Sequence, residues 1–336
     1  MSPQLRTLGR NGPQVNALGL GIMSIGGVYG APGTDEQRFA LLNRAHELGQ
    51  TFWDTADIYG DTEEVIGKWF AKFGKRKDIF LATKFGIQLT PSGLKVDSSP
   101  EYVKACCNKS LQLLQVDQID LYYCHRIDTV TPIEKTIQAM VDLKNEGKIK
   151  YIGISEVSSN TLRRAHAVHP ITALQIEYSP FALEIEDSKI ALLNTCRELG
   201  IAVVAYSPLG RGILTGVKTY EDFAADAFLS TLPRYSKENF AGALKIVSKL
   251  KELAEAKGCT TPQLVLAWLL AQGDDVIPIP GTRNPKYLEE NFNAQYVTLS
   301  ASEVQEIRDV ITKYEPVGDR YVHTPENWMF GESAPL

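Results

Sequence analysis

"IDLYYCHRIDTVTPIEKTIQAMVDLKNEGKIKYIGIS", residues 119–155, contains one complete strand–helix–strand unit. Its two ends, 119–126 and 149–155, are short runs typical of β-strands, and the stretch between them has the pattern of an amphipathic helix. We expect this helix to begin with Thr131 as its N-cap and Pro132 at its first position, and to end at Gly147. Such a unit predicts parallel pairing of its strands, because the crossover helix must cover the sheet that it leaves.

The same alternation runs along the chain. A second helix is expected over residues 34–49, opened by Thr34 and closed by Gly49. Eight strands are expected, at residues 17–22, 51–55, 79–86, 119–126, 149–155, 173–179, 201–207 and 276–281. Eight such units predict an α/β fold, a closed (β/α)8 TIM barrel.

Several segments lie outside the repeat. Residues 5–18 predict a β-hairpin that turns at Asn11 and Gly12 and caps the bottom of the barrel. Residues 210–239 are too long and irregular for an ordinary connection, which indicates a functional lid or binding loop. Extra helices are expected near the C-terminus, at 242–258, 261–273 and 300–314. No linker or shift of composition divides the chain, so we expect one domain over residues 1–336.

Composition excludes several classes of partner. The net charge is −5 and the basic residues are scattered, so the chain has no electrostatic footprint for nucleic acid or anionic lipid. No signal peptide and no run of eighteen apolar residues is present, so we expect neither secretion nor membrane insertion. The five cysteines fit neither a disulfide framework nor a zinc motif. These features favour a cytoplasmic protein with reduced thiols, no bound metal and a small-molecule partner.

Polar side chains gather where the expected strands end. In a parallel barrel these carboxyl ends share one mouth, which is where active sites lie. Taken singly, each has an ordinary structural explanation, such as a helix cap, a rim aromatic, a solvated charge or a core histidine. Together they indicate a site, and they are Asp54, Tyr59, Lys84, His125, Ser155, Gln175, Tyr206, Ser207, Thr282 and Arg283.

Four of these residues form a coherent proton donor. A phenol has a pKa near ~10, and a neighbouring ammonium makes its proton easier to release by stabilising the phenolate. Lys84 supplies that ammonium for Tyr59, and Asp54 keeps the lysine charged in a crowded mouth. His125 is placed to donate a hydrogen bond toward a carbonyl oxygen and orient it.

Seven motifs in order carry a resemblance over nearly the whole chain: "DTADIYG", "TKFG", "LYYCHR", "GKIKYIGIS", "LQIEYSP", "AYSPLGRGIL" and "IPGTRNPKYLEEN". The chain resembles the aldo-keto reductases. Within that superfamily it is most similar to the branch that includes pyridoxal reductase and perakine reductase, partly through "DIYG" and "RRAHAVHPITALQIEYS".

The resemblance implies an NADP-dependent aldehyde reductase or ketone reductase, a monomer by default, with Tyr59 as general acid in a tetrad with Asp54, Lys84 and His125. It implies an extended NADPH across the mouth, with Ser155 and Gln175 on the carboxamide and Tyr206 stacked on the nicotinamide. The remaining implied contacts are Ser207, Leu209, Gly210 and Gly212 on the pyrophosphate, Thr282 and Arg283 on the 2′-phosphate, and Glu290 and Asn291 near the adenine. A guanidinium such as that of Arg283 suits phosphate because it is a permanently charged fork.

Two departures from the family pattern bear on the cofactor. Many relatives have an asparagine after the serine of the fifth strand, where this chain has Glu156. Some relatives have a second arginine for the 2′-phosphate where this chain has Tyr287, beside Lys286. One carboxamide contact and one phosphate contact therefore differ from the pattern.

Two other functions are compatible with such a barrel. Potassium-channel β subunits share the fold and bind NADPH mainly as regulatory subunits, although an asparagine commonly stands there in place of His125. A lyase or isomerase would use Lys84 as a Schiff base, but it gives no role to Arg283 or Tyr206.

Overall fold

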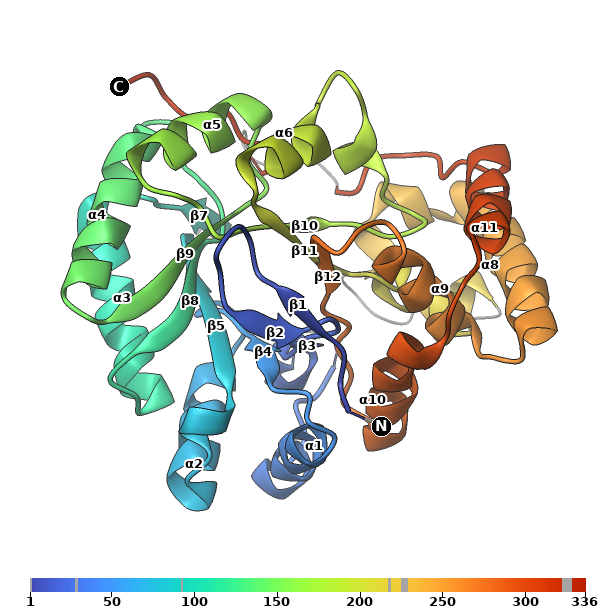
Figure 1. The fold of residues 1–336 in the computed structure, drawn as a ribbon, viewed down its shortest axis with the longest axis horizontal. Helices are drawn as coiled ribbons and strands as arrows, with labels where there is room; N and C mark the ends of the chain where they lie inside the picture. Colours follow the sequence, from blue (N-terminus) through green and yellow to red (C-terminus); the bar gives the residue numbers. More distant parts are fainter. Residues whose placement is uncertain (1, 28–29, 92, 217–218, 225–228, 322–327) are drawn as a thin grey trace.

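The computed structural model describes residues 2–27, 30–91, 93–216, 219–224, 229–321 and 328–336. Eight parallel strands form one curled sheet with helices around it (Figure 1), in the order β12-β11-β10-β9-β8-β5-β4-β3. Every predicted strand is present within its predicted range. The strands are β3 Leu20–Gly21, β4 Phe52–Asp54, β5 Phe80–Phe85, β8 Ile119–Cys124, β9 Ile149–Ser155, β10 Ala173–Glu177, β11 Ala202–Tyr206 and β12 Val276–Pro278.

Glycines close the barrel between its first and last strands. Gly21 forms a parallel bridge with Gly281, and its N–H donates to Pro280 O at 3.1 Å. A Cβ atom on Gly21 would lie 2.7 Å from Ile279 O, so only glycine permits this approach. The predicted closed barrel is confirmed.

The helices surround the sheet (Figure 1). They are α1 Asp35–Glu47, α2 Thr62–Phe73, α3 Pro100–Leu114, α4 Ile133–Asn145, α5 Ser159–Val168, α6 Leu192–Leu199, α7 Tyr220–Ala224, α8 Lys237–Lys257, α9 Thr261–Leu270, α10 Pro285–Phe292 and α11 Ala301–Lys313. Of these, α3, α4, α6 and α9 contact the strands directly, whereas α8 packs on α9 and α11 packs on α8. Among the described residues, no helix combines the length and the apolar character needed to cross a bilayer.

The predicted helix boundaries differ in accuracy. Thr34 caps α1 through a capping box with Gln37, and Gly49 follows the helix with φ +76°, as predicted. Thr131 is not the N-cap of α4, because that position is Pro132. Thr131 is instead hydrogen-bonded to Asp128, whose carboxylate accepts from the Thr131 N–H at 2.6 Å and from the Thr131 hydroxyl at 2.9 Å.

The N-terminal hairpin covers the amino ends of the strands. It comprises β1 Leu5–Thr7 and β2 Gln14–Asn16 and crosses the middle of the barrel in Figure 1. Asn16 Oδ1 accepts from the N–H groups of Thr51 at 2.7 Å and Phe52 at 3.0 Å, where β4 begins. The predicted cap is therefore confirmed, and the opposite end of the barrel is the one that stays open.

Two regions outside the strand–helix repeat follow strands at that open end. An antiparallel hairpin of β6 Ile87–Thr90 and β7 Gly93–Val96 follows β5 and was not predicted from the sequence. The described parts of the expected loop at 210–239 consist of short turns, α7 and the start of α8. Residues 217–218 and 225–228 of that prediction lie outside the described residues.

Replacing Gly153 by alanine tests the tight contact between β8 and β9. A Cβ atom there would lie 2.3 Å from a ring carbon of Tyr123. We expect Gly153→Ala to lower the free energy of unfolding by about 2 kcal/mol or more through overpacking, as measured by urea denaturation. In Gly242→Ala, within α8, a Cβ atom would have no neighbour within 4 Å, and helix propensity should raise stability by up to about 1 kcal/mol. Equal effects of the two substitutions would contradict this account.

Candidate functional site

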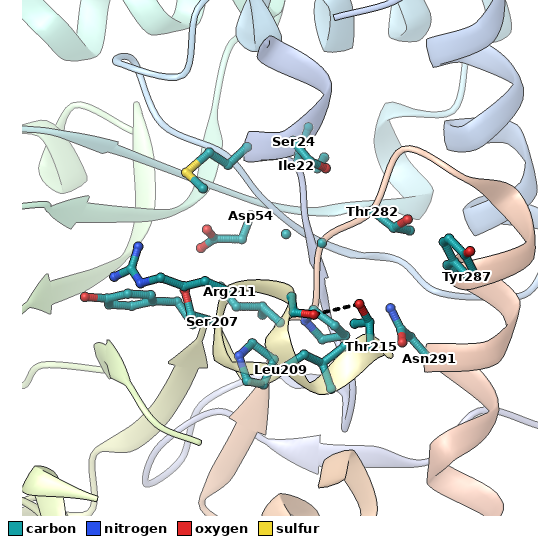
Figure 2. Close-up of a pocket in the computed structure, with 18 of the residues that line it drawn as sticks. Ile22, Ser24, Asp54, Ser207, Leu209, Arg211, Thr215, Thr282, Tyr287 and Asn291 are labelled. Atoms are coloured by element: carbon teal, nitrogen blue, oxygen red, sulfur yellow. Dashed lines mark hydrogen bonds between the residues drawn. The ribbon is translucent and has the colours of Figure 1, made fainter. Parts of the chain in front are cut away.

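A cavity of about 310 Å³ lies at the carboxyl ends of the barrel strands. Figure 2 shows that it is elongated, with Asp54 and Arg211 toward one end and Tyr287 and Asn291 toward the other. Ten residues predicted from the sequence line it: Asp54, Tyr59, Gln175, Tyr206, Ser207, Leu209, Gly212, Thr282, Glu290 and Asn291. The carboxyl ends of the strands therefore surround a cavity, as predicted from the sequence.

A buried ion pair lies beneath one end of this cavity. Lys84 on β5 donates from Nζ to Asp54 Oδ1 on the neighbouring β4 at 2.5 Å, and to Thr55 O at 2.6 Å. The other carboxylate oxygen of Asp54 accepts from Gln175 Nε2 at 2.7 Å. Lys84 is fully buried and Asp54 nearly so.

This pair keeps the lysine charged. Burial alone would lower the pKa of Lys84, but the attraction of Asp54 and Tyr59 outweighs burial and raises the pKa above its ordinary value. Burial raises the pKa of Asp54, and Lys84 opposes that rise. The site thus holds an ammonium group without access to bulk water.

Tyr59 lies directly above the ammonium. Lys84 Nζ is 4.9 Å from the centre of the Tyr59 ring. Burial raises the pKa of Tyr59, and the charge of Lys84 opposes the rise without reversing it. From the sequence we expected Lys84 to ease proton release, and the structure adds that the resting phenol stays protonated.

His125 follows β8 and faces Tyr59. The two rings meet edge to face with centres 5.8 Å apart. Burial, followed by the charges of Arg126 and Lys84, lowers the pKa of His125 well below its ordinary value, so the imidazole is neutral. The structure therefore brings all four predicted tetrad residues together, although Lys84 and His125 do not line the cavity themselves.

Three other predicted contact residues also do not line this cavity. Ser155 Oγ accepts from Arg126 Nη1 at 3.2 Å, and Gly210 is buried in the turn after β11. Arg283 lies beside a neighbouring cavity and donates to Ala31 O at 2.8 Å. It is exposed, just before the N-terminus of α10, where backbone N–H groups and the helix dipole favour an anion.

The turn after β11 has an unusual backbone. Ser207, Gly210, Arg211 and Gly212 all have positive φ angles, from +49° to +100°. A Cβ atom on Gly212 would meet no atom within 4 Å, so the turn presents bare backbone to the cavity that it lines. Such a surface lets an extended ligand approach the main chain closely.

The sequence did not reveal a group of charged residues beside this turn. Glu156, predicted only as a departure from the family pattern, is buried and bound by Arg320 with both oxygens 2.9 Å from the guanidinium. Arg211 lines the cavity and pairs with Glu177 at 2.8 Å. Arg211 could have been found from the sequence, because it lies within the "GRG" of the motif "AYSPLGRGIL". Arg320 could not, because it lies in a C-terminal tail without a motif or periodicity.

The sequence is similar to those of a known protein family. Residues 17–312 match the model of the Aldo/keto reductase family. The chain is 54% identical to an aldo-keto reductase of Strobilurus tenacellus over 91% of this chain and 92% of the relative. It is 47% identical to a Schizosaccharomyces pombe protein named an aldo-keto reductase [NADP(+)], over 100% of this chain and 99% of the relative.

Solved structures agree with the observed fold. The chain is similar to a glycerol dehydrogenase from Gluconobacter oxydans, with a TM-score of 0.80 and 26% identity over 96% of this chain and 98% of that one. It is also similar to the holo form of an aldo-keto reductase from Bacillus halodurans, with a TM-score of 0.76 and 28% identity over 92% and 96% of the two chains.

A second carboxyl group, that of Asp57, lies next to the site, where the Asp57 N–H donates to Lys84 O at 3.2 Å. Asp57 lies between Asp54 and Tyr59 in sequence, and its Oδ1 is buried without a hydrogen-bond partner among the described residues. Burial and then the nearby charge of Glu63 raise the pKa of Asp57 to about 7. The folded protein therefore retains a proton between pH 4 and pH 7 that the unfolded chain releases, so stability falls as pH rises through this range.

Asp57→Asn should remove that penalty. A rise of roughly three pKa units corresponds to at most about 4 kcal/mol, and partial exposure reduces the expected gain in unfolding free energy to about 1–3 kcal/mol at pH 8. The gain should disappear near pH 4, which urea denaturation at several pH values measures. Asp142→Asn is the control, because the half-exposed Asp142 pairs with Lys104, which lowers the pKa of the carboxyl. A gain for Asp57→Asn that is independent of pH would refute the assignment.

Proposed function

The chain belongs to the aldo/keto reductase family, and on that premise we propose that it is an NADPH-dependent reductase that converts an aldehyde or ketone to the alcohol. The observation that carries the proposal is the phenol of Tyr59, placed over the charged Lys84 and edge-on to the neutral His125 at one end of an elongated cavity. We extend the proposal to residues 1–336 as one domain.

The shape of the cavity and the positive charge beside it suit a dinucleotide. Its length leads from Asp54 past Leu209 and Thr215 to Asn291 (Figure 2). Arg283 and Lys286 supply positive charge beside the N-terminus of α10, which suits the 2′-phosphate that distinguishes NADPH from NADH. The S. pombe relative named with NADP(+) supports the same cofactor.

The residues that would hold the cofactor are those of the family pattern. We assign Ser155, Gln175 and Tyr206 to the nicotinamide, and Ser207, Leu209, Gly210 and Gly212 to the pyrophosphate. Thr282 and Arg283 are assigned to the 2′-phosphate, and Glu290 and Asn291 to the adenine. When bound, the reduced nicotinamide supplies a hydride to the carbonyl carbon.

Tyr59 supplies the matching proton to the carbonyl oxygen. A raised pKa keeps its phenol protonated at neutral pH, which a general acid requires. Addition of hydride to the carbonyl carbon forms a C–H bond and moves the C=O π pair onto the oxygen. An alkoxide oxygen is far more basic than a phenolate, so proton transfer from Tyr59 is downhill. The ammonium of Lys84 then stabilises the phenolate that Tyr59 becomes, in surroundings where charges interact strongly.

His125 orients the substrate. Because its imidazole is neutral, one ring nitrogen carries a proton that it can donate in a hydrogen bond to the carbonyl oxygen. Together with Tyr59 it fixes the oxygen between two donors, which leaves the carbonyl carbon facing the cavity. Positioning of this kind lowers the barrier without adding a chemical step.

A finer assignment within the family follows from the sequence motifs. We place the chain beside pyridoxal reductase and perakine reductase within the family, supported by "DIYG" at 57–60 and by residues 163–179. Pyridoxal is therefore included in the substrate panel, beside 4-nitrobenzaldehyde and simple ketones. A role as a regulatory NADPH-binding subunit, like the potassium-channel β subunits, is the outcome that the panel must distinguish.

Tyr59→Phe tests the proposed acid. Loss of general acid catalysis typically costs ~10²–10⁴-fold, so NADPH oxidation with the best carbonyl of the panel should fall by at least about 100-fold. Binding of NADPH, followed by fluorescence, should remain. Tyr151→Phe is the matched control, because Tyr151 packs against Phe80, the first residue of β5, does not line the cavity and should retain full turnover.

The same assay separates the alternatives. Full turnover by Tyr59→Phe would show that another group donates the proton. Tight NADPH binding by the unmodified protein with negligible turnover on the whole panel would favour the regulatory subunit. Running NADH beside NADPH measures the preference that Arg283 is expected to impose.

A further inference from the structure

A buried ion pair ties the C-terminal segment, by which we mean the described residues 314–321 and 328–336, to the end of a barrel strand. Glu156 immediately follows β9, is fully buried and has a positive φ of +53°. Arg320, beyond α11, reaches it with both terminal nitrogens, each 2.9 Å from a different carboxylate oxygen. This bidentate geometry fixes the plane of the carboxylate as well as its position.

The same carboxylate holds the hydroxyl of Tyr206. Tyr206 donates to Glu156 Oε1 at 2.7 Å, and its ring lines the cavity. Tyr321, next to Arg320, lies with its hydroxyl 3.2 Å from that of Tyr206. The orientation of the Tyr206 ring therefore depends on two consecutive residues of the C-terminal segment.

A second ion pair, between Arg211 and Glu177, lies next to the first. Arg211 donates to Glu177 Oε2 at 2.8 Å and to the Tyr321 hydroxyl at 2.7 Å, and Arg320 lies 3.7 Å from Glu177. Burial alone would raise the pKa of Glu156, but the charges of Arg320 and Arg126 outweigh burial and lower it to about 2. The carboxylate is thus permanently ionised and its bonds do not vary over the working pH range.

The backbone fastens the C-terminal segment at a second point. The Gly331 N–H donates to Glu156 O at 2.7 Å, and the Ser158 N–H donates to Gly331 O at 2.9 Å. The Arg320 guanidinium also lies 5.2 Å from the centre of the Phe330 ring. Glu156 is therefore held by the C-terminal segment through both its side chain and its main chain.

Stability alone does not account for such a pair. Two charges taken out of water recover their desolvation cost only through good geometry, and apolar replacements of buried pairs are often equally stable. An apolar pair would, however, not provide a fixed hydrogen-bond acceptor for the hydroxyl of Tyr206. Glu156 does not line the cavity, so its carboxylate is engaged by Arg320 and Tyr206 and not by a ligand.

We propose that Arg320 and Glu156 act as positioning residues that hold the Tyr206 ring in the plane needed to bind the nicotinamide. The arginine orients the carboxylate, the carboxylate orients the phenol, and the phenol forms a wall of the cavity. This inference rests on the proposed function, because it takes Tyr206 as the nicotinamide platform. Glu156, which departs from the family pattern, would then act through Tyr206 and would not contact the carboxamide directly.

A double-mutant cycle between Arg320 and Tyr206 tests the proposal. The variants are Arg320→Leu, Tyr206→Phe, which keeps the ring and removes the hydroxyl, and the two combined. We expect each single variant to weaken NADPH binding by about 10-fold, because each removes a hydrogen bond to a charged partner from the same chain of contacts. The combined variant should bind within about 3-fold of Tyr206→Phe, since residues that act through one another are not additive.

Arg308→Leu is the matched control. Arg308 on α11 also makes a bidentate pair, with Glu186 at 2.8 and 2.9 Å, but it does not line the cavity. Its loss should lower the urea midpoint without changing the NADPH dissociation constant. If Arg320→Leu does not fold, Arg320→Lys enters the same cycle, because it keeps the charge and loses the fork.

Two results would overturn the proposal. One is multiplicative loss of NADPH affinity in the combined variant, which would mean that the two residues act independently. The other is an Arg320 variant that behaves like Arg308→Leu, with lower stability and unchanged binding. Failure of the unmodified protein to bind NADPH would instead refute the proposed function, so the two failures are distinguishable.

Discussion

The ion pair between Lys84 and Asp54 is the interaction on which the site depends. Neighbouring parallel strands present the two side chains to each other, and Gln175 from across the barrel satisfies the second carboxylate oxygen. A buried ammonium without this partner would lose its proton, and a buried carboxylate without the lysine would gain one. With both present, the barrel holds a fixed positive charge below a phenol, where little water screens it.

The rest of the fold keeps this centre closed on one side and open on the other. The N-terminal hairpin covers the amino ends of the strands, and the glycine bridge between Gly21 and Gly281 completes the wall. At the carboxyl ends, turns with positive φ angles replace bulky side chains with bare backbone. The C-terminal segment then adds a second layer of charge around Tyr206, so segments from both ends of the chain shape the barrel that holds the candidate site.

The sequence predicted what depends on local pattern and on topology. All eight strands followed from alternation with amphipathic helices, and the strand-end rule found Asp54, Tyr59, Lys84 and His125 because parallel strands bring their carboxyl ends together. It did not predict the partner of Glu156, because Arg320 is 164 positions away in a segment without periodicity. Thr131 failed as a cap because a competing carboxylate, Asp128, lies three residues before it. The raised pKa of Tyr59 depends on burial, which no motif encodes.

The most direct test of this account removes the ion pair without leaving a buried charge unpaired. In Asp54→Asn combined with Lys84→Met, the rate of hydride transfer is measured in a single turnover beside the NADPH dissociation constant. The account predicts that transfer slows by at least about 100-fold while NADPH affinity changes little, because the ammonium acts on the phenol and not on the cofactor. Transfer at the unmodified rate would show that the phenol of Tyr59 does not need the charge of Lys84.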